Sequence, residues 1–190
     1  MNKSFILILS LLSISFNSFS QNVKKTEEVC YNPNLVKDTS KKSIKSMAVA
    51  IINGDSVKIN YHSPGVRKRI IWGGLVPYDE VWVTGAHDAT TVEFPKPVII
   101  NGKEIPAGKY AFFTIPGKKE WTIIINKNWR QHLATEYDEK GDMVRIKVKP
   151  MKNVHTERLQ YFIRDNGNRK GTISVVWEKL KLSFNIILKP

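Results

Sequence analysis

Cysteine is nearly missing from this sequence, which has one, Cys30, in 190 residues. A single thiol cannot form an intramolecular disulfide, so a disulfide-stapled scaffold is excluded. Acidic residues are also few, because 17 Asp and Glu stand against 30 Lys and Arg, which gives a net charge of +13. Since 42% of the residues are hydrophobic, the chain is too apolar to be a charged disordered tail. Its length fits one folded domain.

Long hydrophobic runs are missing as well. The longest, from Phe5 to Phe16, has about a dozen residues, whereas a membrane-spanning helix needs about 20. Lys3 precedes this run, and the small-x-small triplet that ends at Ser20 follows it, which is the layout of a secretory signal peptide. We therefore predict a signal peptide over residues 1–20, cleaved after Ser20. The prediction makes the protein exported, either periplasmic or secreted, with no transmembrane segment after cleavage.

Residues 21–44 are rich in Lys, Asn, Ser and Thr and show no sustained hydrophobic period. We interpret them as a flexible leader. Cys30 lies in this leader, and its role stays open. The folded domain is expected to span residues 45–190.

A period of two dominates this domain. Val57, Ile59 and Tyr61 alternate with polar residues, as a strand with one buried face requires. Other β-branched and aromatic runs are too short for typical helices, and turn pairs such as Asn53-Gly54 separate them. The pattern predicts an all-β fold, a single-domain antiparallel β-sandwich with jelly-roll character. Only residues 128–137 are expected to form a short helix, capped by Asn128.

The central block from Arg69 to Thr90 combines two tryptophans, a histidine, acids and several glycines. Three later segments carry further motifs: Ala107-Gly108-Lys109-Tyr110-Ala111-Phe112-Phe113-Thr114-Ile115-Pro116-Gly117, Glu120-Trp121-Thr122 and Trp177-Glu178. Together these residues resemble the domain-of-unknown-function 2911 family of exported bacterial proteins, from about Val57 to Ile187. The resemblance implies a compact, mostly antiparallel β-fold behind a signal peptide, with no established activity.

The sequence departs from the family pattern at four places. Val83 replaces an arginine, His87 an asparagine and Asp88 a glutamate, and a tryptophan expected near His132 is missing. If the family shares a site in this block, these changes alter its chemistry here.

The pair His87-Asp88 is the sharpest chemical candidate. It could supply two metal ligands or an acid/base pair if His62, His132 or His155 came near on folding. Adjacent strand residues point to opposite faces, so only a turn would let both side chains reach one ion. No His-x-His or clustered cysteine motif accompanies the pair. We therefore predict no metal and no cofactor, and keep a metal-assisted or acid/base hydrolase at His87 and Asp88 as the alternative.

Tryptophans permit a stacking platform for a sugar or another planar ligand. Trp121 and Trp177 are expected in the core. Trp72 and Trp82 stand beside glycines, which allow a ligand to approach closely, so they are expected to line a groove. The predicted ligand-binding residues are Arg69, Trp72, Trp82, His87, Asp88, Thr90 and Trp129.

Basic residues occur in short clusters without a nucleic-acid recognition motif, so no nucleic acid is expected as a partner. The expected partners are a glycan, an anionic lipid or another component of the cell envelope. The leading functional hypothesis is a small, non-enzymatic binding module for a glycan or other polar ligand. The alternatives are the hydrolase named above and an envelope scaffold without a small ligand; the oligomeric state stays open.

Overall fold

The computed structural model describes residues 42–190. The predicted signal peptide, Cys30 and the predicted leader up to residue 41 lie outside the described residues. The regular elements of the described part are strands and one 3₁₀ turn, and this part contains no helix long and apolar enough to cross a membrane. The elements are β1 (Ser43–Ile52), β2 (Asp55–Pro64), β3 (Thr91–Phe94), β4 (Val98–Ile100), β5 (Lys103–Ile105), β6 (Gly108–Ile115), β7 (Trp121–Asn126), η1 (Glu139–Gly141), β8 (Asp142–Val148), β9 (Met151–Asp165) and β10 (Lys170–Leu188).

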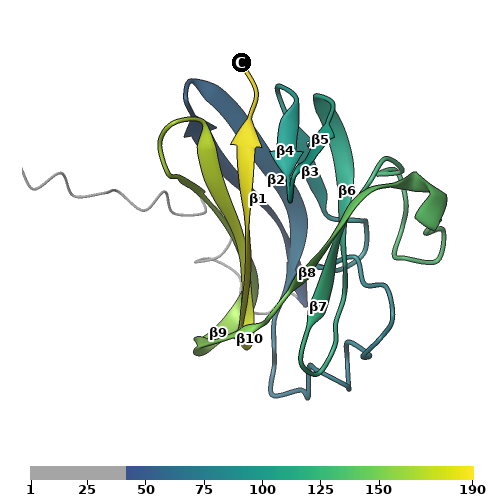
Figure 1. The fold of residues 1–190 in the computed structure, drawn as a ribbon. Coiled ribbons are helices and arrows are strands. Elements are labelled where there is room, and N and C mark those ends of the chain that lie inside the picture. The colour runs from purple at the N-terminus through teal and green to yellow at the C-terminus, as the bar shows by residue number, and fades with distance from the viewer. Residues whose placement is uncertain (1–41) are drawn as a thin grey trace, which may run out of the picture.

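The strands form two sheets that lie face to face (Figure 1). The six-stranded sheet has the order β1-β2-β3-β6-β7-β8, and the four-stranded sheet has the order β5-β4-β10-β9. Neighbouring strands in both sheets are antiparallel. The predicted all-β antiparallel sandwich is therefore confirmed.

The hairpin of β1 and β2 forms as its turn residues require. Asn53 and Gly54 have φ angles of 52° and 87°, the left-handed conformation that an Asn-Gly turn between two strands adopts. On β2, Val57, Ile59 and Tyr61 are buried between the sheets. The alternate residues of β2 therefore face outward, and His62 is one of them.

The strand β10 reverses direction within its own length. Thr172 Oγ1 donates to Asn185 Oδ1 at 2.8 Å, and the hydroxyls of Ser174 and Ser183 are also 2.8 Å apart. An extended chain rises about 3.3 Å per residue, so these pairs can meet only if the chain turns back. Glu178 lies at the reversal with a φ of 54°, and the register with β9 shifts on both sides of it. The two halves of β10 thus lie side by side in the four-stranded sheet (Figure 1).

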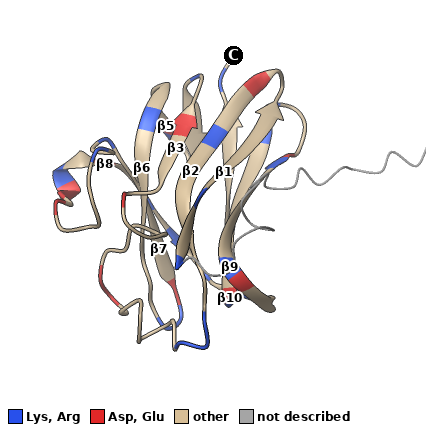
Figure 2. Cartoon of the chain, turned by 180° about the vertical axis from the view of Figure 1, so that it is seen from behind, with Lys and Arg blue, Asp and Glu red and all other residues tan. Residues whose placement is uncertain are grey.

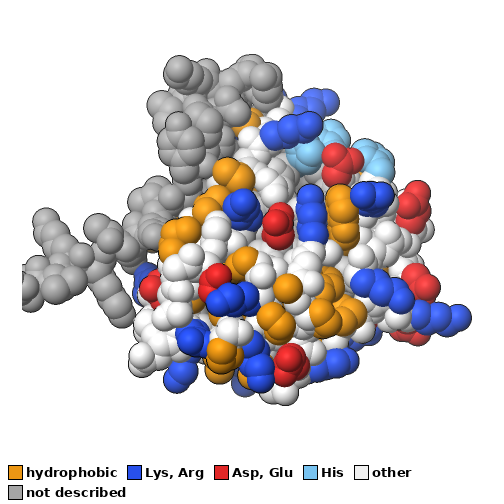
Figure 3. Space-filling view, turned by 90° about the horizontal axis from the view of Figure 1, so that it is seen from above, with side chains coloured by type: hydrophobic (Ala, Val, Ile, Leu, Met, Phe, Trp, Pro, Cys, Tyr) orange, Lys and Arg blue, Asp and Glu red, His pale blue; other side chains and the backbone are white. Residues whose placement is uncertain are grey.

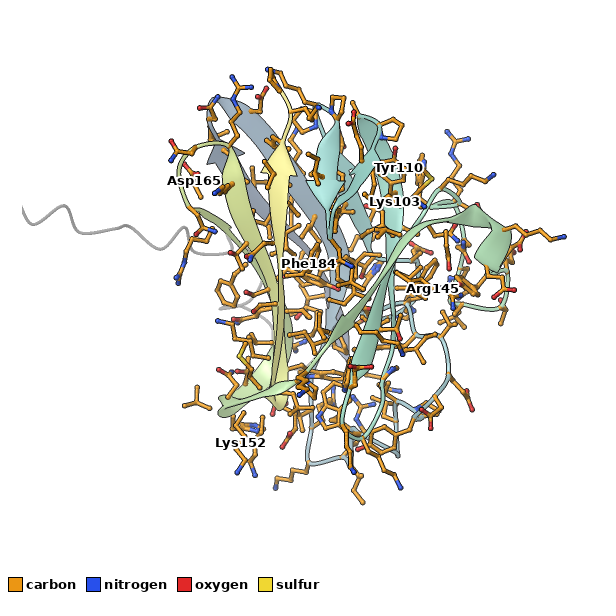
Figure 4. All side chains as sticks on the ribbon, in the orientation of Figure 1. Lys103, Tyr110, Arg145, Lys152, Asp165 and Phe184 are labelled. Carbon is orange, nitrogen blue, oxygen red and sulfur yellow. The ribbon has the colours of Figure 1, made fainter. Side chains whose placement is uncertain are left out.

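The main core fills the space between the sheets. Trp121 and Trp177 are both buried there, as predicted. Phe184 points into the same space in Figure 4, and its ring centroid lies 5.9 Å from that of Phe112 on the opposite sheet. Because both faces of this layer are apolar, burial of these rings is the main force that holds the sheets together.

The short helix predicted for residues 128–137 is wrong. Residues 128–137 contain no helix that Asn128 could cap, and the Asn128 backbone N–H donates to Asn126 Oδ1 at 2.8 Å. Within this segment Leu133 has a φ of 57°, which a right-handed helix does not allow. The segment instead packs Trp129, Ala134 and Tyr137 against the outer face of β6 and β7. Tertiary packing of these apolar side chains has overridden the local preference.

Candidate functional site

The outer face of the six-stranded sheet is covered over β6 and β7. A second hydrophobic cluster lies there, in which Phe113 and Ile124 pack against Val83 and Ala89. The cover comes from two segments, residues 81–90 and residues 127–137. It stops at the edge of β3, so the outward side chains of β1, β2 and β3 lie beside a wall of loops.

A groove of about 550 Å³ runs along this wall, and we call it the sheet-face groove. Its floor consists of outward residues of the strands, and its wall consists of the two covering segments. The ionisable or aromatic residues in its lining are Lys45, His62, Asp88, Lys109, Trp129, Arg130, His132 and Glu136. Tyr61 also borders the groove, although its ring packs between the sheets.

Three histidines from distant parts of the chain meet at the groove. The ring centroids of His62 and His87 are 5.1 Å apart, and those of His87 and His132 are 6.4 Å apart. His87 Nε2 lies 2.8 Å from Ser43 Oγ. Figure 3 shows the histidines gathered at one edge of the molecule, beside acidic and basic side chains.

His62 is the most enclosed ionisable group of this cluster. Burial lowers its pKa, and the neighbouring His87 lowers it further, whereas the nearby Asp88 carboxylate acts in the opposite direction. The protonated form is therefore disfavoured at His62. At neutral pH its ring is therefore mostly in the neutral form, and it lies in the floor of the groove.

Asp88 is paired with His132 across the groove wall. His132 Nδ1 lies 3.2 Å from Asp88 Oδ1, and the two residues also form an isolated antiparallel bridge. This hydrogen bond lowers the pKa of Asp88. The carboxyl group is exposed and therefore ionised at neutral pH, as a group that orients a ligand or a neighbouring ring would be.

The turn that the pair His87-Asp88 would need does exist. His87 has a φ of 62°, so the two residues are not adjacent positions of an extended strand. His62 and His132 are brought near them, whereas His155 lies 3.4 Å from Glu157 on β9 instead. Within residues 42–190 no group of three or more His, Cys, Asp or Glu side chains is placed to hold a metal ion.

Trp129 forms the aromatic part of the groove wall. Lys109 Nζ lies 4.2 Å from its ring centroid, and the guanidinium carbon of Arg130 lies 4.8 Å from it. Both cations are thus held beside the groove by cation–π contacts. Gln131, the next residue, is buried, and its Oε1 has no hydrogen-bond partner.

The structure brings Asp88 and Trp129 to the groove, with His87 against its histidine edge. It places the other predicted ligand-binding residues elsewhere. Arg69 donates to the backbone oxygens of Gly65 and Val66, so it braces the loop that follows β2. Thr90 is buried, and its hydroxyl donates to the backbone oxygen of Thr84 at 3.1 Å.

Trp72 and Trp82 pack against the two buried tryptophans. The centroid of Trp72 lies 4.8 Å from that of Trp121, and Trp82 stacks on Trp177 at 5.7 Å. Trp82 Nε1 donates to the backbone oxygen of Gly85, whereas the buried Nε1 atoms of Trp72, Trp121 and Trp177 have no conventional partner. The edge-to-face rings offer these groups only the weak acceptor of a π face. These tryptophans therefore belong to the inter-sheet core and leave the groove to Trp129.

Sequence reasoning did not identify the basic side chains of the groove. Lys45 and Lys109 are simple outward positions of two strands, and nothing local distinguishes them from surface lysines. They meet because β3 pairs with both β2 and β6, which is a long-range pairing. The period-two pattern could have assigned them to the outer face, but not to one groove.

A family model described as a protein of unknown function (DUF2911) matches residues 43–186 of the chain. This match spans all the strands of the sandwich, up to the second half of β10. Neither a curated protein nor a solved structure matches the chain.

Proposed function

We propose that this chain, which belongs to the DUF2911 family, is a non-enzymatic binding module. Its sheet-face groove would take a polar ligand that carries negative charge, and an acidic glycan is the ligand class we favour. The observation that carries this proposal is the convergence of Lys45, Lys109 and Arg130 on one groove beside Trp129.

The charge in the groove supports an anionic ligand. Three permanent cations face two carboxylates, Asp88 and Glu136, and the Asp88 carboxylate is already engaged by His132. A carboxylate or sulfate on a sugar would meet Lys45 and Lys109 without displacing a strong ion pair, because neither ammonium group lies in an ion pair of the groove. Such contacts form charge-assisted hydrogen bonds, which are stronger than neutral ones.

Neutral groups of the groove fit sugar hydroxyls. Asn60 and Thr91 lie on the floor, and their amide and hydroxyl groups can both donate and accept hydrogen bonds. The faces of the Trp129 ring are contacted by Lys109 and Arg130, so this ring supports the cations instead of offering an open stacking surface. Recognition in this scheme depends on hydrogen bonds and charge.

The pKa of Asp88 argues against a role for this residue as the general acid of a hydrolase. A general acid must hold its proton near neutral pH, which requires a raised pKa, whereas the pKa of Asp88 is lowered. The His87 ring is already hydrogen-bonded to Ser43. Both residues thus place hydrogen-bonding groups at the edge of the groove.

Export of the protein is part of the same proposal. It rests on the signal-peptide pattern of residues 1–20, and a glycan ligand suits a protein outside the cytoplasm. N-terminal sequencing of the protein recovered from its own cells would test it. A mature chain that starts at Gln21 is the expected result, and retention of Met1 in the cell interior would refute export.

The binding proposal is tested by calorimetric titration of the chain from Gln21 with an oligogalacturonate, and with a neutral oligosaccharide of equal length. We expect binding of the acidic oligosaccharide only, weakened by added salt. Lys109→Gln should weaken binding about tenfold, because it removes a charge-assisted contact of about 1.5 kcal/mol. Lys152→Gln is the matched control, since it removes the same charge from β9 of the other sheet.

Equal affinity for the neutral oligosaccharide, or equal losses in the Lys109 and Lys152 variants, would refute the anionic-ligand proposal. The hydrolase alternative predicts instead that products of the oligosaccharide accumulate and that His87→Ala abolishes their formation. Chromatography of the titration mixture after long incubation separates the two functions.

A further inference from the structure

The loop between β2 and β3 exposes two aliphatic side chains at one end of the sandwich. Ile70 is 79% exposed and Leu75 is 46% exposed, although both are large hydrophobic residues. The backbone N–H of Leu75 donates to the oxygen of Ile70 at 3.0 Å, so the two side chains sit on one turn.

This exposure does not arise from a loosely held loop. Ile71 and Val76, which alternate with the exposed pair, are buried in the main core. The Val76 N–H donates to the Ile71 oxygen at 2.9 Å, and the Gly73 N–H donates to the Val76 oxygen at 2.9 Å. The turn is thus anchored on its inner side and presents Ile70 and Leu75 on its outer side. An apolar pair held in water by a fixed turn indicates a partner that buries it.

Basic side chains lie on the same loop and on a turn joined to it. Lys68 precedes Ile70 in the same loop, and the β6–β7 turn adds Lys118 and Lys119. The two segments are held together, because the Asp79 N–H donates to the Pro116 oxygen at 2.7 Å. Figure 2 shows the blue segments at the lower edge of the molecule, where both turns project.

Acidic residues on the same segments are fewer and partly engaged. Residues 65–80 and 116–120 hold three acidic side chains, Asp79, Glu80 and Glu120, against five basic ones, Arg67, Lys68, Arg69, Lys118 and Lys119. Glu120 also lies 3.7 Å from the Lys147 ammonium. The exposed cations therefore outweigh the carboxylates at this end.

The start of β9 extends the same surface. Met151 and Val154 are exposed there, next to Lys152, which Figure 4 places at the lower end of the sandwich. Backbone contact joins this region to the loop, since the Val66 N–H donates to the Glu157 oxygen at 2.7 Å. Half of the exposed large hydrophobic side chains of residues 42–190 thus lie at this end. We call it the loop-end surface, and it consists of Lys68, Ile70, Leu75, Lys118, Lys119, Met151, Lys152 and Val154.

We propose that the loop-end surface docks on an anionic lipid bilayer. Ile70 and Leu75 enter the boundary between headgroups and acyl chains, while Lys68, Lys118 and Lys119 meet the lipid phosphates. Fixed aliphatic side chains with lysines on the same loop and on the turn joined to it have the chemistry of an interfacial membrane contact, in which apolar burial and charge act together. None of these residues lines the sheet-face groove, so this inference stands apart from the proposed ligand binding.

The experiment is co-sedimentation of the chain from Gln21 with vesicles of phosphatidylcholine, with and without phosphatidylglycerol. Binding is expected only to the vesicles that contain phosphatidylglycerol. Replacing Lys68, Lys118 and Lys119 by Gln should weaken it about fivefold per lysine at low salt. The matched control replaces Lys103, Lys127 and Lys170 by Gln, which removes the same charge elsewhere on the chain and should leave most of the binding intact.

A second pair of variants tests insertion. Ile70→Ser with Leu75→Ser should weaken binding about tenfold or more, since both variants remove aliphatic surface that would be buried in the bilayer. Ile51→Ser with Ile187→Ser is the control, because these side chains are 49% and 38% exposed on β1 and β10. Circular dichroism confirms that each variant folds.

Equal binding to both vesicle types overturns the proposal, and so does a loss that is equal in variants and controls. Loss in the lysine variant alone, with full binding after Ile70→Ser and Leu75→Ser, also overturns it, because charge without insertion is then sufficient.

Discussion

The hydroxyl of Tyr161 ties the groove wall to the other sheet, and its removal is our main stability prediction. Tyr161 is fully buried on β9, and its hydroxyl donates to the backbone oxygen of Thr84 at 2.9 Å. Thr84 has a φ of 51° and begins the segment that carries His87 and Asp88. Tyr161→Phe deletes this bond without creating a large cavity.

The expected loss of stability depends on which hydrogen bonds the Thr84 oxygen keeps in the variant. It still accepts the Thr90 hydroxyl at 3.1 Å, so it is not left without a partner. The loss is therefore that of one buried hydrogen bond, about 1 kcal/mol of unfolding free energy. In a domain of this size such a loss lowers Tm by about 2–4 °C.

Tyr110→Phe is the matched control. The Tyr110 hydroxyl donates to the oxygen of Pro106 at 2.8 Å, but Pro106 is exposed, so water can replace the lost donor. Urea denaturation of the two variants and the parent chain measures both costs. If Tyr161→Phe lowers the free energy of unfolding no more than Tyr110→Phe does, with the m-value unchanged, the hydrogen bond of Tyr161 does not stabilise the groove wall and our reasoning is wrong.

Three further predictions follow from buried polar groups. Asn126→Ala should lower the free energy of unfolding, measured by urea denaturation, by about 2–3 kcal/mol. The reason is that the buried amide donates to the Asp138 oxygen at 2.9 Å and to the Asp142 carboxylate at 2.7 Å. A loss smaller than that of Tyr161→Phe would contradict this prediction. Burial raises the pKa of Tyr161 well above 10 and that of Tyr137 to about 12, so above pH 10 only the unfolded chain ionises these groups and the folded state loses stability. The Tm measured in thermal melts should therefore fall above pH 10, and it should fall less in Tyr161→Phe. An equal fall of Tm in the variant and the parent chain would contradict this prediction. The lowered pKa of His62 favours its neutral form in the folded state, so its contribution to stability is present above pH 6.5 and is lost as the pH falls. In thermal melts at several pH values, His62→Gln should therefore show a smaller decrease of Tm between neutral and acidic pH than the parent chain. An unchanged dependence of Tm on pH would refute this prediction.

The sequence predicted the strands well because each is encoded locally. Val57, Ile59 and Tyr61 alternate with polar residues, and Asn53-Gly54 favours a hairpin turn in any context. The segment 128–137 was misread as a helix because its apolar residues pack on Phe113 and Ile124, which are distant in the sequence. The reversal of β10 could not be predicted from the sequence either, because Glu178 is not a residue type that favours turns.

For the candidate site too, some residues could be predicted from local sequence and others could not. The block around His87 and Asp88 was chosen from local chemistry, and the structure does place Asp88 in the groove. Trp72 and Trp82 were chosen because glycines flank them, yet their partners are Trp121 and Trp177 from other strands. Whether an indole faces a ligand or another indole depends on contacts that its neighbours in sequence do not reveal.

By itself, the sequence determined the fold class, because period-two alternation and turn pairs act over a few residues at a time. The tertiary structure alone decided which outward residues share a groove. Lys45, His62, Lys109 and His132 come from four separate segments, and only the pairing of β2, β3 and β6 with a cover of loops brings them together. Short-range patterns specify strands, whereas a site of this kind depends on long-range strand order.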